Sequence, residues 1–199
     1  KEVELAEKPS AIVTDELKKV AQDIKDAGVK LLEENLVQGT WGNIAVRISD
    51  KEMMATPSAL DYVMLKPEQM AIVDMESMEW KGSNKPTSEK GVHAKLLLAH
   101  PDSNATVHTH PFYGSILAAM RQPLVVPEKY RDILGDVVPV SKFGPSGTGM
   151  LVKNTAAAIG NAPCCFMASH GVVARGKDLE DAFRICRALE DACKDYLLN

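Results

Sequence analysis

Apolar residues recur at three- and four-residue intervals in five stretches of the chain, a spacing typical of helices with one buried face. The first helix is predicted to begin at the pair TD before ELKKV and to end before the glycines of VQGTWGN. The second should span residues 88–99, capped by Thr87 or Ser88, and the last about 178–197. The two others are predicted within YGSILAAM and GTGMLVKNTAAAIG.

Shorter apolar or alternating runs separate these helices and predict β-strands. In chain order the runs are IAVRIS, EMMAT, MAIVDM, SMEW, ATVHTH, VVPV, CCFMASHG and VVARG. Residues 121–136 follow no period and are predicted to be irregular. Tight turns join several strand pairs, which favours antiparallel pairing. We therefore predict one α/β domain over residues 1–199 with a mostly antiparallel sheet.

The bulk composition excludes some classes of protein. The 199 residues are 45% apolar and 25% charged, as in ordinary globular chains. The net charge is −4 without a basic run, which argues against nucleic acid as a partner. No apolar stretch approaches the ~20 residues of a transmembrane helix, so we expect no membrane partner. The first residues, KEVELAEKPS, lack the apolar region of a signal peptide, which predicts a cytoplasmic protein.

The four cysteines do not form a pattern typical of disulfides. Cys164 and Cys165 are adjacent in an apolar run. Cys186 and Cys193 lie on the last predicted helix, roughly 10 Å apart along its axis, which is too far for a disulfide. Free buried thiols are typical of a reducing compartment such as the cytoplasm.

Two histidines lie one residue apart at the end of the predicted strand ATVHTH. Residues i and i+2 of a strand point to the same face, so His108 and His110 project side by side, close enough to bind one metal ion. A solvated strand face is the alternative. The short β-branched run after a helix favours an inner strand, and Pro111 ends it, which places the pair at a strand end, where functional sites are frequent.

A catalytic metal site typically has three protein ligands and an open position. His170, which closes an apolar strand before a glycine, is the candidate third ligand, although a His-Gly turn is also a common structural feature. Glu89, at the start of the second helix, could bind the metal, accept a proton or belong to the helix cap. His93 lies one helical turn later and could be a ligand or a packing residue, and His100 is predicted at the surface.

Three loops share a composition that suits an anion: GTWGN (39–43), TPSA (56–59) and KPTSE (85–89). Each offers hydroxyl or amide side chains and the backbone N–H groups of a turn, and the last also opens a helix. The same residue types fill ordinary turns. Together with a candidate metal site, the loops predict a small phosphorylated substrate, and the lack of a P-loop argues against a nucleotide.

The ordered set QGTWGNIAVR, TPSALDY, KPTSE, VHTHP and SHG resembles the class II aldolase/adducin-head family, over nearly the whole chain. The resemblance implies an α/β/α fold around an antiparallel sheet and a bound Zn²⁺, with Mn²⁺ or Co²⁺ as other candidates. It implies His108, His110 and His170 as metal ligands. It further implies Glu89 as both metal ligand and catalytic base, whereas His93 falls on a position that is not a ligand in the family.

The resemblance also implies a phosphate site and a second subunit. The phosphate site falls on Thr40, Asn43, Ser58, Ala59, Thr87 and Ser88. The family has a glycine at the position of Ala59, and we expect the alanine N–H to serve a phosphate only if its φ is negative. A tyrosine from a neighbouring subunit donates a proton in the family, and Tyr130 is the nearest candidate here. The implied assembly is a C4 homotetramer with active sites between subunits.

The function implied by the resemblance is reversible, metal-assisted cleavage of a ketose 1-phosphate, such as L-fuculose 1-phosphate, to dihydroxyacetone phosphate and an aldehyde. The metal would act as a Lewis acid for the enediolate, and Glu89 would take the C3 proton in the condensation direction. Related pentulose-phosphate 4-epimerases carry Asp at the position of Glu89, which favours the aldolase. The alternatives are such an epimerase, a sugar-phosphate dehydratase and a non-catalytic module like the adducin head.

Overall fold

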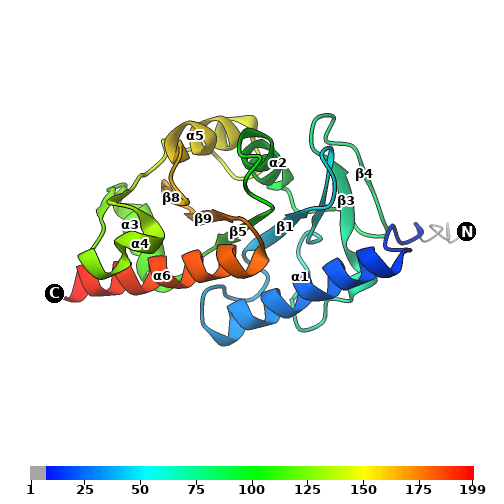
Figure 1. The fold of residues 1–199 in the computed structure, drawn as a ribbon, viewed down its shortest axis with the longest axis horizontal. Coiled ribbons are helices and arrows are strands. Elements are labelled where there is room, and N and C mark those ends of the chain that lie inside the picture. Colours follow the sequence, from blue (N-terminus) through cyan, green and yellow to red (C-terminus); the bar gives the residue numbers. More distant parts are fainter. Residues whose placement is uncertain (1–7) are drawn as a thin grey trace, which may run out of the picture.

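Seven strands form one sheet at the centre of the computed structural model, which describes residues 8–199 (Figure 1). The strands are β1 (Asn43–Arg47), β2 (Glu52–Ala55), β3 (Ala71–Asp74), β4 (Trp80–Lys81), β5 (Ala105–Thr109), β8 (Cys164–Met167) and β9 (Gly171–Gly176). Their order is β4-β3-β2-β1-β5-β9-β8, and each named neighbour pair is antiparallel. The predicted α/β fold with a mostly antiparallel sheet is therefore confirmed. The prediction made from the lack of an apolar signal-peptide region rests mainly on residues 1–7, which lie outside the described residues.

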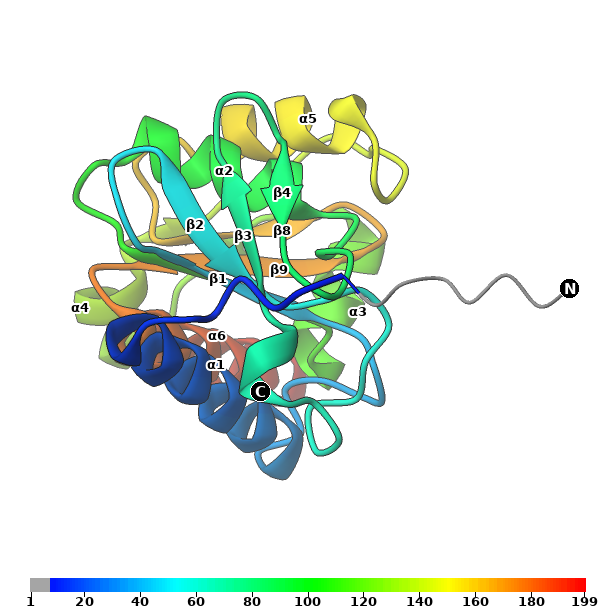
Figure 2. The ribbon, with the colours of Figure 1, turned by 90° about the vertical axis from the view of Figure 1, so that its right-hand side faces the viewer.

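Helices cover both faces of this sheet and give three layers (Figure 2). The longer ones are α1 (Asp15–Glu33), α2 (Lys90–Ala99), α3 (Phe112–Met120), α5 (Gly149–Ile159) and α6 (Leu179–Leu198). The larger apolar core lies between the sheet and α1, α3 and α6, whereas α2 and α5 pack on the opposite face over two smaller clusters. Within the described part of the chain, no helix has the length and apolar character needed to cross a membrane.

Strand β5 lies between β1 and β9, and all five of its residues are buried. Ala105 and Val107 belong to the larger core. Because side chains alternate along a strand, Thr106 and His108 face the other way, toward α2. The expectation of an inner strand is confirmed. The imidazole of His108 therefore lies within the fold, with little contact with solvent.

The helix starts show why Glu89 is available to the sheet. The predicted cap of α1 is confirmed, since Thr14 Oγ1 accepts the N–H of Leu17 at 3.2 Å. The predicted cap of α2 by Thr87 or its neighbour is wrong, because the helix begins two residues later, at Lys90. The Thr87 hydroxyl instead accepts the N–H of Glu89 at 3.2 Å. Glu89 occupies the cap position without a side-chain cap bond, so its carboxylate can reach the strands.

The segment predicted to be irregular contains more structure than its sequence suggests. Residues 121–136 hold the short strand β6 (Leu124–Val125), the 3-10 turn η2 (Glu128–Tyr130) and the short helix α4 (Arg131–Leu134). Strand β6 pairs with β7 (Val137–Val138) in a separate two-stranded ribbon. A two-residue strand has no readable period, so its pairing was not predictable from local pattern. The four cysteines are free and buried, as predicted.

Candidate active site

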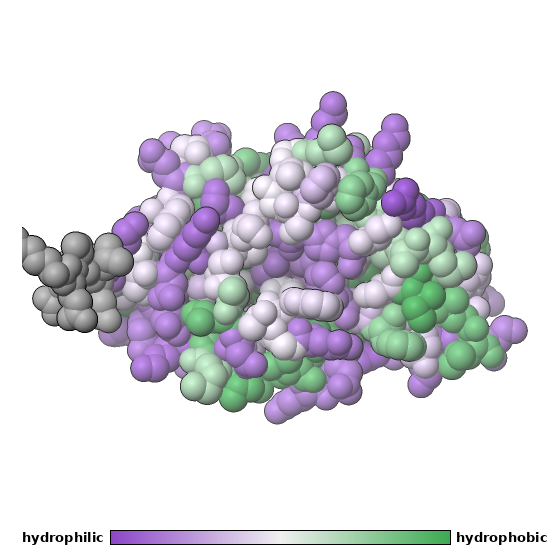
Figure 3. Space-filling model, turned by 180° about the vertical axis from the view of Figure 1, so that it is seen from behind, coloured by the Kyte–Doolittle hydropathy of each residue, from purple (hydrophilic) through white to green (hydrophobic). Residues whose placement is uncertain are grey.

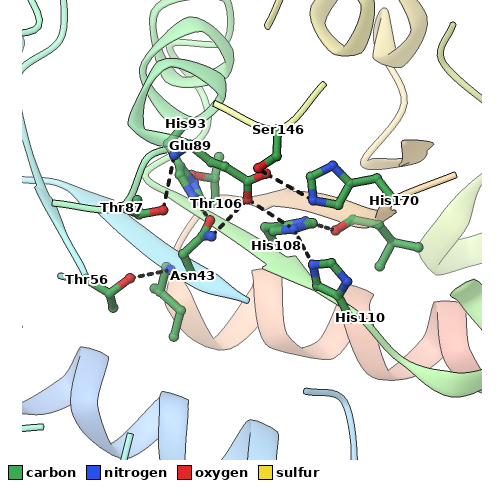
Figure 4. A network of polar contacts seen from close by, with 12 residues as sticks. Asn43, Thr56, Thr87, Glu89, His93, Thr106, His108, His110, Ser146 and His170 are labelled. Carbon is green, nitrogen blue, oxygen red and sulfur yellow. Dashed lines mark hydrogen bonds and ion pairs between the residues drawn. The ribbon is translucent and has the colours of Figure 1, made fainter. Parts of the chain in front are cut away.

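Three histidines meet at one end of the central strands (Figure 4). His108 is on β5, His110 follows that strand by one residue, and His170 directly precedes β9. One ring nitrogen from each lies within 4.8 Å of the others, and within the described residues they form the group suited to a metal ion. His93 and His100 are outside this group. The structure thus brings together the three histidines that the sequence analysis singled out.

The close approach of β5 and β9 makes this grouping possible. A Cβ on Gly171 would lie 2.5 Å from the carbonyl oxygen of Thr109, so only glycine lets the strand that follows His170 come this near. His108 Nδ1 donates to the carbonyl oxygen of Val172 at 2.8 Å, which assigns the proton to Nδ1. The His108 Nε2 lone pair therefore faces the group, an arrangement typical of histidines that bind metal.

The protonation state of the imidazoles also suits metal binding. Burial lowers the pKa of His108 to about 4 and that of His110 to about 3. Both rings are therefore neutral at neutral pH. Their Nε2 atoms lie 2.8 Å apart. Converging neutral imidazole nitrogens are a ligand set that Zn²⁺ and similar divalent ions accept.

The carboxylate of Glu89 lies against two of the three rings. Oε2 is 3.1 Å from His108 Nε2, and Oε1 is 3.0 Å from His170 Nε2. Ser146 Oγ also donates to Oε1, at 3.1 Å, and Asn43 Nδ2 donates to Oε2, at 3.0 Å. Glu89 is 5% exposed, so the donors Asn43 and Ser146 orient a largely buried carboxylate beside the imidazoles.

The ionisation of Glu89 follows from these partners. Burial raises the pKa of the carboxyl, but the neighbouring His108 and hydrogen bonds from His170 and Asn43 lower it more, and the balance lies well below its usual range. Since His108 is itself neutral at neutral pH, the hydrogen bonds are what keep Glu89 ionised there. The result is an oriented carboxylate beside the three imidazoles, suited to accept a proton from a ligand in the site.

The three loops predicted to bind an anion meet around a cavity of about 530 Å³ in front of the histidines. His110, His170 and Glu89 line the cavity, and His108 is buried behind them. All residues predicted for the phosphate site also line it: Thr40, Asn43, Ser58, Ala59, Thr87 and Ser88. The structure therefore places the candidate phosphate and metal sites in one cavity.

Two members of the phosphate set differ from expectation. Ala59 has a φ of +58°, the left-handed conformation that glycine adopts easily. The condition of a negative φ is thus not met, so the conformation of Ala59 does not support a contact between its N–H and a phosphate. Asn43 is bonded by its amide to Glu89 and His93, which leaves one amide hydrogen for a phosphate.

Tyr130 lies outside this cavity. Its hydroxyl donates to Asp195 on α6 at 2.7 Å, and the same carboxylate pairs with Lys129 at 2.6 Å. Within one chain the phenol is therefore held by a neighbouring helix and does not reach the histidines. A catalytic role for Tyr130 requires a second subunit.

Several residues of the cavity wall were assigned no role by the sequence analysis, among them Trp41, Phe143, Gly144, Ser146 and Ser169. Trp41 belongs to the GTWGN loop, where it was not assigned a role, and its ring centroid lies 5.6 Å from that of His110. Ser146 lies in the loop before α5. No local signal marks that loop, since its approach to Glu89 depends on the packing of α5 on α2.

Comparison with known proteins agrees with this geometry. The model of the class II aldolase and adducin N-terminal domain family matches residues 22–197. The 5-methylthioribulose-1-phosphate/5-deoxyribulose-1-phosphate aldolase of Rhodospirillum rubrum is 31% identical over 174 residues, 86% of this chain and 77% of that protein. The L-fuculose phosphate aldolase of Methanocaldococcus jannaschii is 31% identical over 170 residues, 85% of this chain and 91% of that protein.

A solved structure of an L-fuculose 1-phosphate aldolase superimposes with a TM-score of 0.87 and 29% identity, covering 94% of this chain and 87% of that one. The chain belongs to the class II aldolase and adducin N-terminal domain family, so the predicted resemblance is confirmed. Within that family it is an enzyme of the class II aldolase type. Such enzymes depend on a metal, and the three histidines are the site in this chain that fits one.

Proposed function

We propose that this enzyme catalyses the reversible cleavage of a ketose 1-phosphate to dihydroxyacetone phosphate and an aldehyde. The observation that carries the proposal is the Glu89 carboxylate, 3.0 and 3.1 Å from two imidazoles, on the wall of a cavity that three anion-binding loops also line. A proton acceptor, a metal site and a phosphate site in one cavity are what a metal-dependent aldolase needs. The relatives named above, which act on ketose phosphates, support the same reading.

We propose Zn²⁺ as the ion, held by His108, His110 and His170, with Mn²⁺ or Co²⁺ as other candidates. The ion would supply a Lewis acid for the negative charge that develops on the ketone oxygen. The cluster of ligand atoms within 4.8 Å contains the three histidines and not Glu89. This geometry supports Glu89 as a proton acceptor beside the site, and its role as a fourth ligand is a further proposal.

The remaining side chains of the site would bind the phosphate and transfer protons. The hydroxyls of Thr40, Ser58, Thr87 and Ser88 and one amide hydrogen of Asn43 would bind the phosphate. Glu89 would take the C3 proton of dihydroxyacetone phosphate in the condensation direction and return it in cleavage. Tyr130 of a neighbouring subunit would protonate the alkoxide that forms from the aldehyde, after its hydroxyl leaves Asp195.

That last role requires an oligomer, and we propose a homotetramer. Figure 3 shows apolar side chains gathered at the end of the molecule that holds α3 and the C-terminal end of α6. Exposed apolar side chains on these helices are Phe112, Met120, Tyr196 and Leu198. An exposed apolar patch supports a contact between subunits. The cytoplasm is the proposed compartment, supported by the four free, buried cysteines.

The cavity wall also supports a choice of aldehyde. Trp41 is 61% exposed and Phe143 47% exposed, and both side chains line the cavity. Exposed aromatic rings on a cavity wall favour an apolar group of the ligand, because burying it removes apolar surface from water. We therefore propose a ketose 1-phosphate whose end remote from the phosphate is a deoxy or thioether group.

A retro-aldol screen with detection of dihydroxyacetone phosphate tests both the proposed cleavage reaction and the proposed deoxy or thioether end of the substrate. The substrates are 5-deoxyribulose, 5-methylthioribulose, L-fuculose and ribulose 1-phosphates, of which the first and last differ by one hydroxyl. We expect 5-deoxyribulose 1-phosphate to exceed ribulose 1-phosphate in kcat/KM by about 10- to 100-fold, and Trp41→Ser to reduce this preference. Turnover without cleavage of the C3–C4 bond would contradict the aldolase and support an epimerase or a dehydratase.

Metal analysis tests the ion independently of turnover. The purified enzyme should contain one divalent ion per chain, and His108→Ala should lose most of it because a ligand nitrogen is removed. His100→Ala is the matched control, since His100 lies outside the histidine cluster. Full metal content in His108→Ala would mean that another group holds the ion.

A further inference from the structure

A chain of hydrogen bonds runs behind Glu89, away from the cavity (Figure 4). Asn43 Nδ2 lies 3.0 Å from Glu89 Oε2, and Asn43 Oδ1 contacts His93 Nε2. His93 Nδ1 lies 2.6 Å from Thr106 Oγ1. The three residues come from β1, α2 and β5, so the chain links three elements of the fold. His93 and Thr106 are fully buried, and Asn43 is 7% exposed.

Elementary bonding rules assign every hydrogen in this chain. An ionised carboxylate only accepts, so the Asn43 amide must donate to Glu89 and turn its oxygen toward His93. That oxygen also only accepts, so His93 must carry its proton on Nε2. The Nδ1 of a neutral imidazole is then a lone pair, which accepts the hydroxyl hydrogen of Thr106. The reversed amide would place two acceptors face to face at Glu89, with a buried cost of about 1–3 kcal/mol.

We propose that His93 is a positioning residue that acts on Glu89 through Asn43. Its Nε2–H holds the Asn43 oxygen, which keeps the amide nitrogen directed at Glu89 Oε2 and orients the carboxylate for proton transfer. His93 itself cannot touch a substrate, because it has no exposed surface and lines no part of the cavity. Its effect on catalysis rests on the proposed function, whereas its tautomer and hydrogen bonds do not.

The tautomer can be measured without any substrate. Proton–nitrogen NMR correlation of the zinc-loaded enzyme with isotope-labelled histidine separates the two neutral tautomers, and His93→Gln assigns the signal. We expect an exchange-protected Nε2–H and an unprotonated Nδ1 for His93. Thr106→Val should shift the Nδ1 resonance, because the hydroxyl donor is lost. A proton on Nδ1, or a His93 signal that Thr106→Val leaves unchanged, would overturn the proposal.

Kinetics tests the consequence for Glu89. In His93→Gln the side-chain amide nitrogen can still donate to Asn43, whereas His93→Leu has no donor. We expect His93→Leu to lower kcat about 10- to 100-fold with little change in KM, and His93→Gln to recover most of the loss. Zinc content, inorganic phosphate binding and thermal unfolding of both variants should establish that they are folded.

An equal loss of kcat in His93→Gln and His93→Leu would mean that His93 acts through packing alone. A normal kcat in His93→Leu would mean that His93 has no role in catalysis. Either result overturns the proposal. A parent enzyme that cleaves none of the ketose 1-phosphates would instead overturn the proposed function. The NMR result would still decide whether the hydrogen-bond chain is as assigned.

Discussion

At the scale of single residues, Glu89 has the most consequential surroundings, because four side chains converge on its carboxylate. Two of them are imidazoles at 3.0 and 3.1 Å, and Asn43 and Ser146 donate to the same two oxygens. A glutamine at this position has nearly the same shape but loses the charge, the ability to take a proton and one of the two acceptor oxygens. The substitution therefore separates the architecture of the site from its chemistry.

Glu89→Gln should retain the bound metal and lose proton exchange at C3 of dihydroxyacetone phosphate. We expect a decrease of at least about 100-fold, the usual contribution of a positioned general base. The exchange is followed by NMR in deuterated water, with metal content measured on the same sample. Exchange at the rate of the parent enzyme would show that another group takes the proton.

Ala59 has a left-handed backbone conformation that is unfavourable for an alanine. Its φ of +58° costs an alanine about 1–2 kcal/mol, while glycine loses about 0.4–1 kcal/mol through greater freedom in the unfolded chain. Ala59→Gly should therefore leave the free energy of unfolding unchanged or raise it by up to about 1.6 kcal/mol in urea denaturation. The control Ala157→Gly, on the exposed side of α5, should lower it by about 1 kcal/mol. Equal losses in both variants would contradict the strain assigned to Ala59.

At the scale of elements, one buried side chain of α6 caps the start of α3. Pro111, directly after His110, is the cap residue of α3 and makes no side-chain cap bond. Glu190 of α6 takes that role, since its carboxylate accepts the N–H groups of Tyr113 and Gly114 at 2.8 Å each. Glu190 is 5% exposed, so these bonds are shielded from water. The start of the helix that follows the histidine strand is thereby capped by a residue 77 positions from Tyr113 and 76 from Gly114.

Glu190→Ala should lower the free energy of unfolding by about 2–4 kcal/mol, because two buried N–H groups lose a charged acceptor. Glu190→Gln keeps one acceptor oxygen and should lose less. Asp191→Asn is the control, since its ion pair with Arg187 is partly exposed and should contribute about 0–1 kcal/mol. Urea denaturation measures all three, and a Glu190→Ala variant as stable as the control would exclude the capping role.

At the scale of the whole molecule, the buried imidazoles make stability depend on pH. Burial lowers the pKa of His93 and of His108 to about 4, from 6.5. The unfolded chain then binds more protons than the folded one between these values, so the free energy of unfolding rises with pH. The stabilisation is fully present above pH 6.5 and is lost as the pH falls toward 4. The lowered pKa of Glu89 acts in the same direction at still lower pH.

Metal-free enzyme, prepared with a chelator, should therefore lose about 2 kcal/mol per fully buried imidazole between pH 7 and pH 5. Urea denaturation at both pH values measures the change. His93→Gln should show a smaller dependence, because one titrating group is removed. Metal-loaded enzyme should be more stable at pH 7, since the ion binds the folded chain. A metal-free protein equally stable at pH 7 and pH 5 would contradict the buried neutral state of these rings.

Local pattern was sufficient for most helices and strands of this protein and for part of its site. The periodic spacing in ELKKVAQDIKDAG predicts α1, and the alternation in ATVHTH places His108 and His110 on one side of a strand. Both are local properties, set by the 3.6- and two-residue periods of the backbone. The run VVPV predicts β7, whereas its partner β6 was missed, because a two-residue strand is defined by its partner and carries no period of its own.

The sequence by itself determined most of the elements, the family and the residue types available for chemistry. Only the tertiary structure decided which of them meet. His170 approaches His108 because Gly171 lets β9 lie against β5. The left-handed backbone of Ala59 and the hydrogen bonds from Asn43 through His93 to Thr106 likewise depend on chain segments far apart in sequence. The physical reason is that hydrogen bonds and close contacts act over a few ångströms in space, whereas spacing along the chain describes only the neighbours within one element.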